Sequence, residues 1–392
     1  PLGEEELKKT KKKLGWVYPA FFVPQNILKF WKKTAVKGIK INKKWNHAFK
    51  KINVKKRSFF LNHLKTKIPN NAFIDFKKLK AKFINSNEEI ATREASNLAI
   101  DILSKKIPSL FGGAADLTVS NLTKSKNQKV YNNKNSKGTY LYFGVREHVM
   151  VAAMSGMSLH GGIIPYGGSF LIFTDYCRPS IRLASFMKIK AIYIMTHDSI
   201  GLGEDGPTHQ PIEHLASLRS IPNLNVLRPA DAIETLECWE TALNQSTPSV
   251  ISLTRQDIPI VRNKNIFTNL SSQGAYIISE TKKSKRDITI LATGSEVSIA
   301  IEAKNILEKK FINVAVVSMP CWEIFDKKND TYKNKILGPI EKRIAIEAAS
   351  KFGWTRYIKN DDYILGMNSF GSSAPHKDLY NNFGLNAKEL VK

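Results

Sequence analysis

The loop 196–211 gathers the side chains of this chain that are best suited to chemistry. It reads Thr-His-Asp-Ser-Ile-Gly-Leu-Gly-Glu-Asp-Gly-Pro-Thr-His-Gln-Pro and follows an apolar run, 191–195, that is typical of a buried parallel strand. Glycines allow the loop a tight path, which brings His197, Asp205 and His209 toward one spot. One histidine alone would favour a polar surface loop. Two histidines with nearby acids favour a ligand site at the carboxyl end of the strand.

Two more groups of residues add to this pattern. Glu147 stands in Gly-Val-Arg-Glu-His, where an expected strand gives way to an expected helix. Phe170, Phe173 and Tyr176 follow at intervals of three, and on an expected helix over 170–188 their rings would share one face. An aromatic stripe is usually part of a core. Here a carboxylate, an aromatic wall and a histidine-rich loop fall within one domain, which favours a site.

The elements that must position these residues alternate between strand and helix. Apolar runs expected to be strands lie at 139–145, 163–166, 191–195, 226–228 and 250–254. Helical patterns separate them, and a second alternation begins near Gly274. This order predicts an α/β fold with two doubly wound, mainly parallel-sheet domains. We place them at 86–260 and 261–392, after a Lys-rich, partly helical segment over 1–85 that ends an earlier domain and forms a linker.

Cysteine usage and hydropathy exclude several classes of protein. The chain has 392 residues and only three cysteines, Cys177, Cys238 and Cys321, with no Cys-x-x-Cys spacing. This argues against a disulfide framework or a zinc site and favours a reducing, cytoplasmic location. No apolar run approaches the roughly 20 residues of a membrane span, so we expect no membrane partner.

The net charge of +26 has three explanations. A general drift toward Lys, Asn and Ile ranks first, and a positive field that attracts phosphorylated substrates ranks second. Nucleic-acid binding ranks third, because the sequence shows no RNP motif, zinc finger or helix-turn-helix signature. We therefore expect no nucleic-acid partner.

A set of motifs carries a family resemblance along the whole chain. They are Gly-Gly-Ala-Ala-Asp-Leu at 112–117, Ser-Asn-Leu-Thr at 120–123, Gly-Val-Arg-Glu at 144–147, Ser-Leu-His-Gly-Gly at 158–162, the loop 196–211, Ser-Met-Pro at 318–320 and Phe-Gly-Ser-Ser-Ala-Pro at 370–375. In order and spacing the chain resembles the C-terminal part of transketolase. The resemblance implies that 1–85 ends a diphosphate-binding domain, that 86–260 is a pyrimidine-binding domain, and that 261–392 is the family's C-terminal domain.

The resemblance implies a thiamine diphosphate cofactor and names the residues around its pyrimidine ring. Glu147 matches the acid that bonds the ring nitrogen, which favours the imino tautomer whose nitrogen removes the thiazolium proton. Phe170, Phe173 and Tyr176 match the aromatic wall on which the ring stacks, and Asp116 matches a residue near the cofactor.

The resemblance also implies a sugar-phosphate substrate. The residues that match its phosphate-binding positions are Arg93, Ser120, His197 and Arg255. Arginine suits this task because its fork binds two phosphate oxygens at once. Asp205 matches the acceptor of a substrate hydroxyl, and His209 matches a histidine beside the reacting carbonyl. The implied reaction is the reversible transfer of a two-carbon ketol unit from a ketose phosphate to an aldose phosphate, a step of the pentose phosphate pathway.

The family's Gly-Asp-Gly motif with a downstream Asn, which holds the metal and the diphosphate, does not occur in the sequence. We therefore expect the N-terminal diphosphate-binding domain to be missing, together with the ligands for Mg²⁺ or another divalent cation. No metal site is expected within this chain. The chain would then be a fragment, a truncated product or one half of a split enzyme, inactive alone, with a second copy or an N-terminal half as its partner.

Other functions remain open at this point. A different thiamine-dependent enzyme, such as deoxyxylulose-phosphate synthase or a dehydrogenase beta-type subunit, is the closest rival. The Thr-His-Asp form of the loop, with His197, favours transketolase over these relatives. A non-catalytic partner subunit and a basic nucleic-acid-binding protein are rivals from other classes, and a steep salt dependence of binding to random DNA would reveal the latter.

Overall fold

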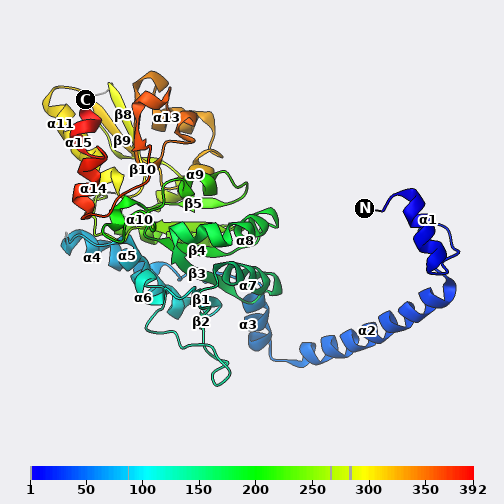
Figure 1. Cartoon of the computed structure of the whole chain (residues 1–392). Helices are drawn as coiled ribbons and strands as arrows, with labels where there is room; N and C mark the ends of the chain where they lie inside the picture. The colour runs from blue at the N-terminus through cyan, green and yellow to red at the C-terminus, as the bar shows by residue number, and fades with distance from the viewer. Residues whose placement is uncertain (1, 87, 265–266, 282–284) are drawn as a thin grey trace. The chain divides into compact units, whose positions relative to one another are not determined.

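The computed structural model describes residues 2–86, 88–264, 267–281 and 285–392, and the chain divides into two compact units, Pro1–Asn62 and His63–Lys392 (Figure 1). The first unit is helical: it holds α1 (Glu4–Lys13), α2 (Gln25–Lys51) and most of α3 (Val54–Leu64). None of these helices contains a buried residue. The expectation of a Lys-rich, partly helical leading segment is confirmed.

The second unit begins with a six-stranded sheet. Its strands are β1 (Leu110–Ala114), β2 (Tyr140–Tyr142), β3 (Ile164–Phe170), β4 (Ile192–Thr196), β5 (Asn225–Leu227) and β6 (Ser249–Leu253). They lie in the order β2-β1-β3-β4-β6-β5, and every pair is parallel. The helices around this sheet are α4 (Ile74–Ser86), α5 (Thr92–Lys106), α6 (Thr118–Asn121), α7 (Glu147–His160), α8 (Thr174–Phe186), α9 (His214–Arg219) and α10 (Ala232–Asn244).

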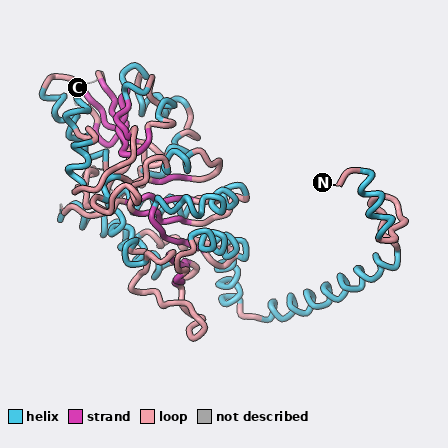
Figure 2. The backbone as a smooth tube through the Cα atoms, in the orientation of Figure 1, coloured by secondary structure: helices cyan, strands magenta, loops and turns pink. Residues whose placement is uncertain are grey.

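Strand β4 shows why helices cover both faces of this sheet (Figure 2). Its side chains alternate, and all of them are buried. Ile192 and Ile194 join a core with α4, α5 and α10, whereas Tyr193 and Met195 join a second core with α7, α8 and α9. A strand that is apolar on both faces must be sandwiched, which gives the doubly wound architecture.

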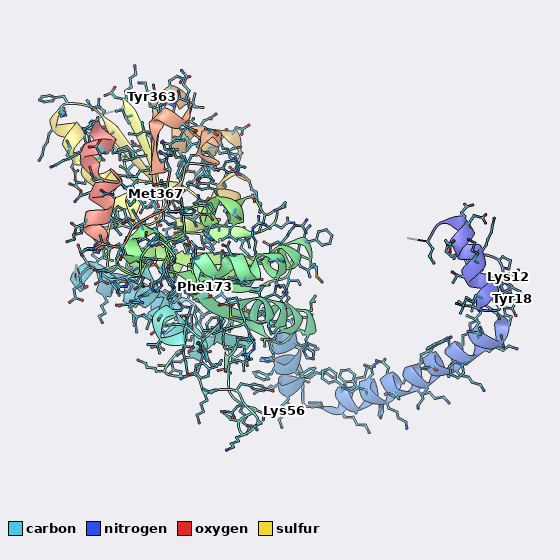
Figure 3. The ribbon with its side chains drawn as sticks, in the orientation of Figure 1. Lys12, Tyr18, Lys56, Phe173, Tyr363 and Met367 are labelled. Atoms are coloured by element: carbon cyan, nitrogen blue, oxygen red, sulfur yellow. The ribbon has the colours of Figure 1, made fainter. Side chains whose placement is uncertain are left out.

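A five-stranded sheet follows. Its strands are β7 (Tyr276–Ser279), β8 (Ile288–Ala292), β9 (Val314–Ser318), β10 (Arg343–Ser350) and β11 (Ile364–Met367), in the order β11-β10-β8-β9-β7. Among the strands that the structure describes in this sheet, only the edge strand β7 runs antiparallel to its neighbour. Its helices are α11 (Glu296–Lys309), α12 (Trp322–Phe325), α13 (Asp330–Leu337), α14 (His376–Asn382) and α15 (Ala387–Val391). Met367, labelled in Figure 3, packs with α11 on one face of this sheet. The predicted fold class is confirmed.

Short 3-10 helices connect several of these elements. They are η1 (Leu171–Phe173), η2 (Ile200–Leu202), η3 (Ser271–Gln273), η4 (Ile340–Lys342), η5 (Trp354–Arg356) and η6 (Asp361–Tyr363). Within the described part of the chain, no helix combines the length and the apolar character that crossing a bilayer requires.

Candidate active site

The candidate site lies along the carboxyl ends of four neighbouring strands. Asp116 follows β1, Phe170 ends β3, His197 follows β4 and Arg255 follows β6. The strands β1, β3, β4 and β6 are adjacent in the sheet, so residues far apart in sequence meet at one edge. This is the edge at which ligands bind in open α/β sheets, and the sequence predicted it.

His197 lies at the centre of this edge. Its ring stacks on Phe170 with 3.7 Å between the ring centres, and its Nδ1 is 2.8 Å from the Thr196 hydroxyl. Its backbone has a φ of +60°, which is uncommon for a residue with a side chain and must be held by the surrounding packing. Burial, with help from the charges of Arg93 and Arg255, lowers the pKa of His197 to about 3. The ring is therefore neutral at physiological pH.

Arg93, Ser120, His197 and Arg255 form what we call the phosphate edge. Arg93, on α5, donates a hydrogen bond from Nη1 to the carbonyl oxygen of Ser120 at 2.7 Å. Burial lowers the pKa of Arg93, and the nearby charge of Arg255 lowers it further. Arg255 is exposed, and Nε of Arg93 is buried without a hydrogen-bond partner among the described residues. Two close guanidinium groups with free donors suit a phosphate.

Phe170, Phe173 and Tyr176 line up as an aromatic wall, but they do not share one helix. Phe170 ends β3, Phe173 (labelled in Figure 3) ends η1, and Tyr176 lies in α8. The expected helix over 170–188 is therefore wrong at its start, because backbone pairing continues β3 through Phe170 opposite Thr196. The rings still form a row: Phe170 and Phe173 stack at 5.7 Å, and Tyr176 follows at 5.8 Å.

His209 and Asp205 lie on the loop that closes over this wall. The ring of His209 meets Phe170 and Phe173 edge-on, at 6.0 and 5.8 Å. Asp205 is exposed in the turn between Gly203 and Gly206, and its charge opposes the lowering of the pKa of Arg93. The loop thus brings one histidine to the aromatic wall and one acid toward the phosphate edge.

Glu147 is the first residue of α7, and only 7% of it is exposed. Its carboxylate has no hydrogen-bond or salt-bridge partner among the residues that the structure describes. Burial, with the charge of Glu147, raises the pKa of Cys177 to about 12, so the carboxylate lies near Cys177 of α8. We call Glu147, Asp116 and the aromatic wall the cofactor edge. An acid without a partner and a row of stacked rings in the same domain suit a planar heterocycle with a ring nitrogen that carries a proton.

Asp116 also lies at this edge, in a left-handed backbone conformation with a φ of +62°, and it is exposed. Small aspartate side chains tolerate such a backbone better than most residues do.

A cavity of about 390 Å³ adjoins the aromatic wall and is lined by Phe173, Tyr176 and His214 among others. The structure thus brings the phosphate edge, the aromatic wall and His209 together, whereas Asp116 and Glu147 are placed only by the elements that carry them.

Sequence reasoning missed two residues that hold the site together. Asn121 accepts a hydrogen bond from the Thr196 hydroxyl at 2.7 Å, and the same hydroxyl contacts His197. Gln210 donates to the carbonyl oxygens of Gly203 and Ser372, at 3.0 and 2.8 Å, and so ties the end of the loop to its middle and to the segment after β11. Asn121 lies within the Ser-Asn-Leu-Thr motif, which was the available signal.

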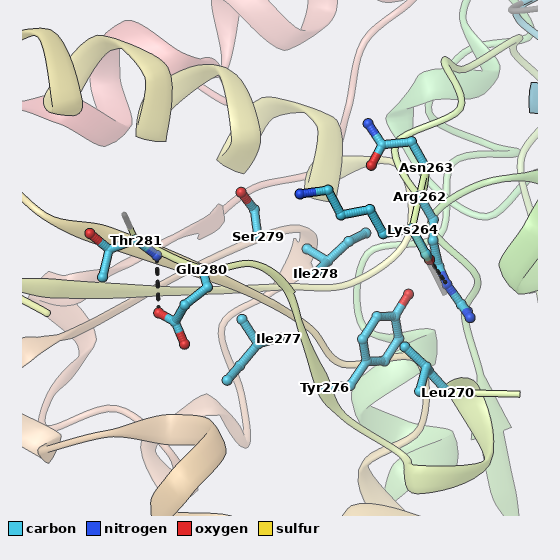
Figure 4. A pocket seen from close by; sticks show the side chains of 10 residues that line it. All are labelled: Arg262, Asn263, Lys264, Leu270, Tyr276, Ile277, Ile278, Ser279, Glu280 and Thr281. Carbon is cyan, nitrogen blue, oxygen red and sulfur yellow. Dashed lines mark hydrogen bonds between the residues drawn. The ribbon is translucent and has the colours of Figure 1, made fainter. Parts of the chain in front are cut away.

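A second cavity lies outside this site. It measures about 520 Å³ and is lined by Arg262, Tyr276, Glu280 and other residues from the connection into the second sheet and β7 (Figure 4). It contains none of the predicted site residues. Among the described residues, no cluster of three or more His, Cys, Asp or Glu side chains could hold a metal ion.

Three family models match the chain. Residues 88–261 match the transketolase pyrimidine-binding domain, and residues 274–386 match the transketolase-like C-terminal domain. Residues 1–69 match the transketolase thiamine diphosphate-binding domain. The expectation that this last domain is missing is therefore wrong. The absence of the Gly-Asp-Gly motif concerns one stretch of this domain and does not show that the whole domain is missing.

Individual proteins show the same similarity. A transketolase from Sinorhizobium medicae is 48% identical over 396 residues, covering 100% of this chain and 56% of its own length. The solved transketolase of Leishmania mexicana is 38% identical with a TM-score of 0.90, and the match covers 57% of it. A Pichia stipitis transketolase, solved in complex with xylulose 5-phosphate, is 34% identical with a TM-score of 0.90, covering 58%. This chain thus spans a little over half the length of the proteins it matches.

Proposed function

The chain belongs to the transketolase family, and from this we propose that it transfers a two-carbon ketol unit from a ketose phosphate to an aldose phosphate. The observation that carries the proposal is the position of His197. This neutral ring joins the aromatic wall, through Phe170, to a pair of arginines. Such a junction suits a site that holds a heterocyclic cofactor on one side and a phosphorylated sugar on the other.

Thiamine diphosphate fits the cofactor edge, and when bound it supplies the carbon nucleophile of the reaction. Glu147 would hold a proton at the pyrimidine nitrogen, because a carboxylate without another partner on a largely buried residue gains from such a bond. Phe173 and Tyr176 would stack on the ring. Mg²⁺ or another divalent cation would accompany the diphosphate, with ligands outside the pyrimidine-binding part.

The substrate end follows from the phosphate edge. Arg93 and Arg255 would each direct guanidinium donors at the phosphate, and His197 would add a neutral ring nitrogen. His209 would act at the reacting carbonyl, where a histidine can hold or release a proton near neutral pH. Asp205 would accept a hydrogen bond from a sugar hydroxyl.

The same family membership leads us to propose a homodimer that works in the cytoplasm as part of the pentose phosphate pathway. Exposed apolar side chains on α7 and α8 support the dimer. They include Val149, Leu183 and Phe186, which are 53%, 56% and 77% exposed. Apolar groups repeated along two adjacent helices favour a protein interface. Sedimentation of the chain tests this, since a dimer at micromolar concentration is the expected result and a monomer contradicts it.

The test of the function is a transfer assay with thiamine diphosphate, Mg²⁺, xylulose 5-phosphate and ribose 5-phosphate. The chain is assayed alone, where the sequence predicts no turnover, and joined to the part of the Sinorhizobium relative outside the matched region. We call the second form the fused enzyme. Transfer by either form supports the proposal. A fused enzyme that binds the cofactor without transfer contradicts it, and one that binds no cofactor contradicts the cofactor edge.

A further inference from the structure

A buried ionic network lies directly behind His197. Its centre is Arg228, which follows β5 and is fully buried. Arg228 donates from Nε to the carboxylate of Asp198 at 2.8 Å and from Nη1 to the carboxylate of Glu296. Glu347 lies 3.7 Å from the same Nη1. Burial alone would lower the pKa of Arg228, but the surrounding carboxylates raise it well above its usual value.

The network joins the two sheets of the second unit. Asp198 and Arg228 follow strands of the six-stranded sheet, whereas Glu296 opens α11 and Glu347 lies in β10 of the five-stranded sheet. Arg219, at the end of α9, adds two hydrogen bonds to Glu347, both at 2.8 Å. Paired charges that are fully buried fix a geometry strictly, since a displaced partner leaves the other charge without compensation.

The backbone around Arg228 is shaped for this contact. Gly294 has a φ of +62°, and a Cβ at this position would lie 2.6 Å from the Arg228 guanidinium. Nη1 of Arg228 also donates to the carbonyl oxygen of Thr293 at 3.0 Å, and the backbone carbonyl oxygen of Arg228 accepts a hydrogen bond from the Gly294 N–H at 3.2 Å. The loop after β8 therefore encloses the guanidinium with backbone as well as with carboxylates.

Two consecutive residues connect this network to the site. Asp198 immediately follows His197, whose left-handed backbone needs outside support. Ser199 comes next, and its hydroxyl lies 3.5 Å from that of Tyr380, which donates to Glu296 at 2.7 Å. The peptide that carries His197 is thus held from behind by groups of the C-terminal sheet and its helices.

We propose that the Asp198–Arg228–Glu296 network positions His197 for the sugar phosphate, so that the C-terminal sheet sets substrate affinity although its residues lie behind the phosphate edge. This inference rests on the proposed function, because it assigns His197 to phosphate binding. Glu296 is then a positioning residue. It acts through Arg228 and Asp198 on the orientation of one ring.

The chain offers a matched control. Glu237 on α10 is also fully buried, accepts from Lys80 at 2.7 Å and pairs with Arg262. This second network resembles the first in burial and charge, but its members are not adjacent to any residue of the site. Glu296→Gln and Glu237→Gln each remove one buried negative charge of the same kind.

The experiment measures the dissociation constant of ribose 5-phosphate by calorimetry, with ribose as the unphosphorylated comparison. We expect Glu296→Gln to raise the dissociation constant of ribose 5-phosphate about tenfold, which is the size of one lost charge-assisted contact. Glu237→Gln should change this constant less than about twofold. Tyr380→Phe keeps every charge and should weaken binding about twofold to threefold. In a His197→Ala background, Glu296→Gln should add nothing, because both changes remove the same contact.

Several results would overturn the inference. One is that Glu296→Gln binds ribose 5-phosphate as tightly as the wild type. Another is that Glu296→Gln weakens this binding equally with and without His197, which would show that Glu296 has only a structural role. If Glu296→Gln fails to fold, the binding of ribose 5-phosphate to Tyr380→Phe tests the inference in the same way. If the wild type itself does not bind ribose 5-phosphate, the proposed function fails. The imidazole NMR signals of His197 then decide the inference: they must move in Glu296→Gln and stay in Glu237→Gln.

Discussion

The two edges of the site differ in how far the chain itself completes them. At the phosphate edge, His197 is 3% exposed, stacked on Phe170 and bonded to Thr196, and Arg93 bonds to the Ser120 carbonyl. At the cofactor edge, Tyr176 is 64% exposed, and Glu147, 7% exposed as a residue, has a carboxylate with no partner among the described residues. The first edge is held in place by its own neighbours, whereas the second edge offers groups to something else.

This difference separates two kinds of contribution. A side chain that is already fixed can bind a ligand with little loss of conformational freedom, so changes at the phosphate edge should alter affinity. An acid without a partner gains a hydrogen bond only when a proton donor is bound, so a change there should alter the chemical step. Variants of the fused enzyme can test each side of this division.

Glu147→Gln should have the largest effect. Glutamine keeps the size of the side chain but cannot stabilise a positive charge on the pyrimidine nitrogen, so turnover should fall by about 10²–10⁴-fold, the contribution of a positioned acid–base group. The fall should be the same for xylulose 5-phosphate and for hydroxypyruvate. Deuterium exchange at the thiazolium carbon measures the step directly, and an unchanged exchange rate would refute this role.

His209→Ala should come next. Its ring meets Phe170 and Phe173 edge-on at the aromatic wall, so we expect its role not to depend on a phosphate. We expect kcat to fall by about 10²-fold with either donor. A loss confined to the phosphorylated donor, seen in steady-state kinetics with both, would move His209 to the phosphate edge.

Arg93→Ala and Arg255→Ala should raise KM for xylulose 5-phosphate and leave hydroxypyruvate nearly unaffected. A charge-assisted contact contributes about 1.5–3 kcal/mol, which corresponds to about one to two decades of affinity. Lys359→Ala is the control, because it removes an exposed positive charge from the C-terminal sheet region. Equal losses with both donors would contradict the division between the two edges.

The smallest effect concerns the pH dependence of stability. The folded state keeps His197 neutral down to about pH 3, whereas an unfolded histidine takes up its proton near pH 6.5. Between these values the unfolded state binds more protons, so the stability that a neutral His197 contributes is complete above about pH 6.5 and falls as the pH drops.

Urea unfolding of the wild type and of His197→Asn at pH 7, 6 and 5 measures this effect. The free energy of unfolding of the wild type should fall relative to the variant below about pH 6.5, by at most about 1.4 kcal/mol per pH unit. A constant difference between the two proteins across this range would show that His197 is not held neutral by burial.

Much of the site could be predicted because its residues follow strand ends. Apolar runs indicated β4 and β6, the polar loop directly after β4 indicated His197, and the family resemblance identified Arg255 after β6. Strand β3 was harder, since Gly167 and Gly168 are poor strand formers. Both are required by packing: a Cβ on Gly167 would lie 2.6 Å from the Met154 sulfur, and one on Gly168 would lie 2.5 Å from a Thr123 methyl. Such contacts between distant segments override local preference.

The network behind His197 could not be predicted for a related reason. Its members Asp198, Arg228, Glu296 and Glu347 are separated by 30, 68 and 51 positions, and each one alone is an ordinary charged residue in sequence. Only the fold brings them to one buried point. Asp198 could be singled out because it follows His197 in the loop, but its arginine partner follows a different strand.

The proposed function requires one sheet edge of this chain to hold the phosphate of a sugar substrate. A crystal structure of the chain with ribose 5-phosphate tests it most directly. We predict that the phosphate oxygens lie within hydrogen-bonding distance of Arg93, Arg255 and His197, with the sugar carbons toward His209. A phosphate bound elsewhere, such as in the cavity of Figure 4, with these four side chains free of ligand, would contradict the account.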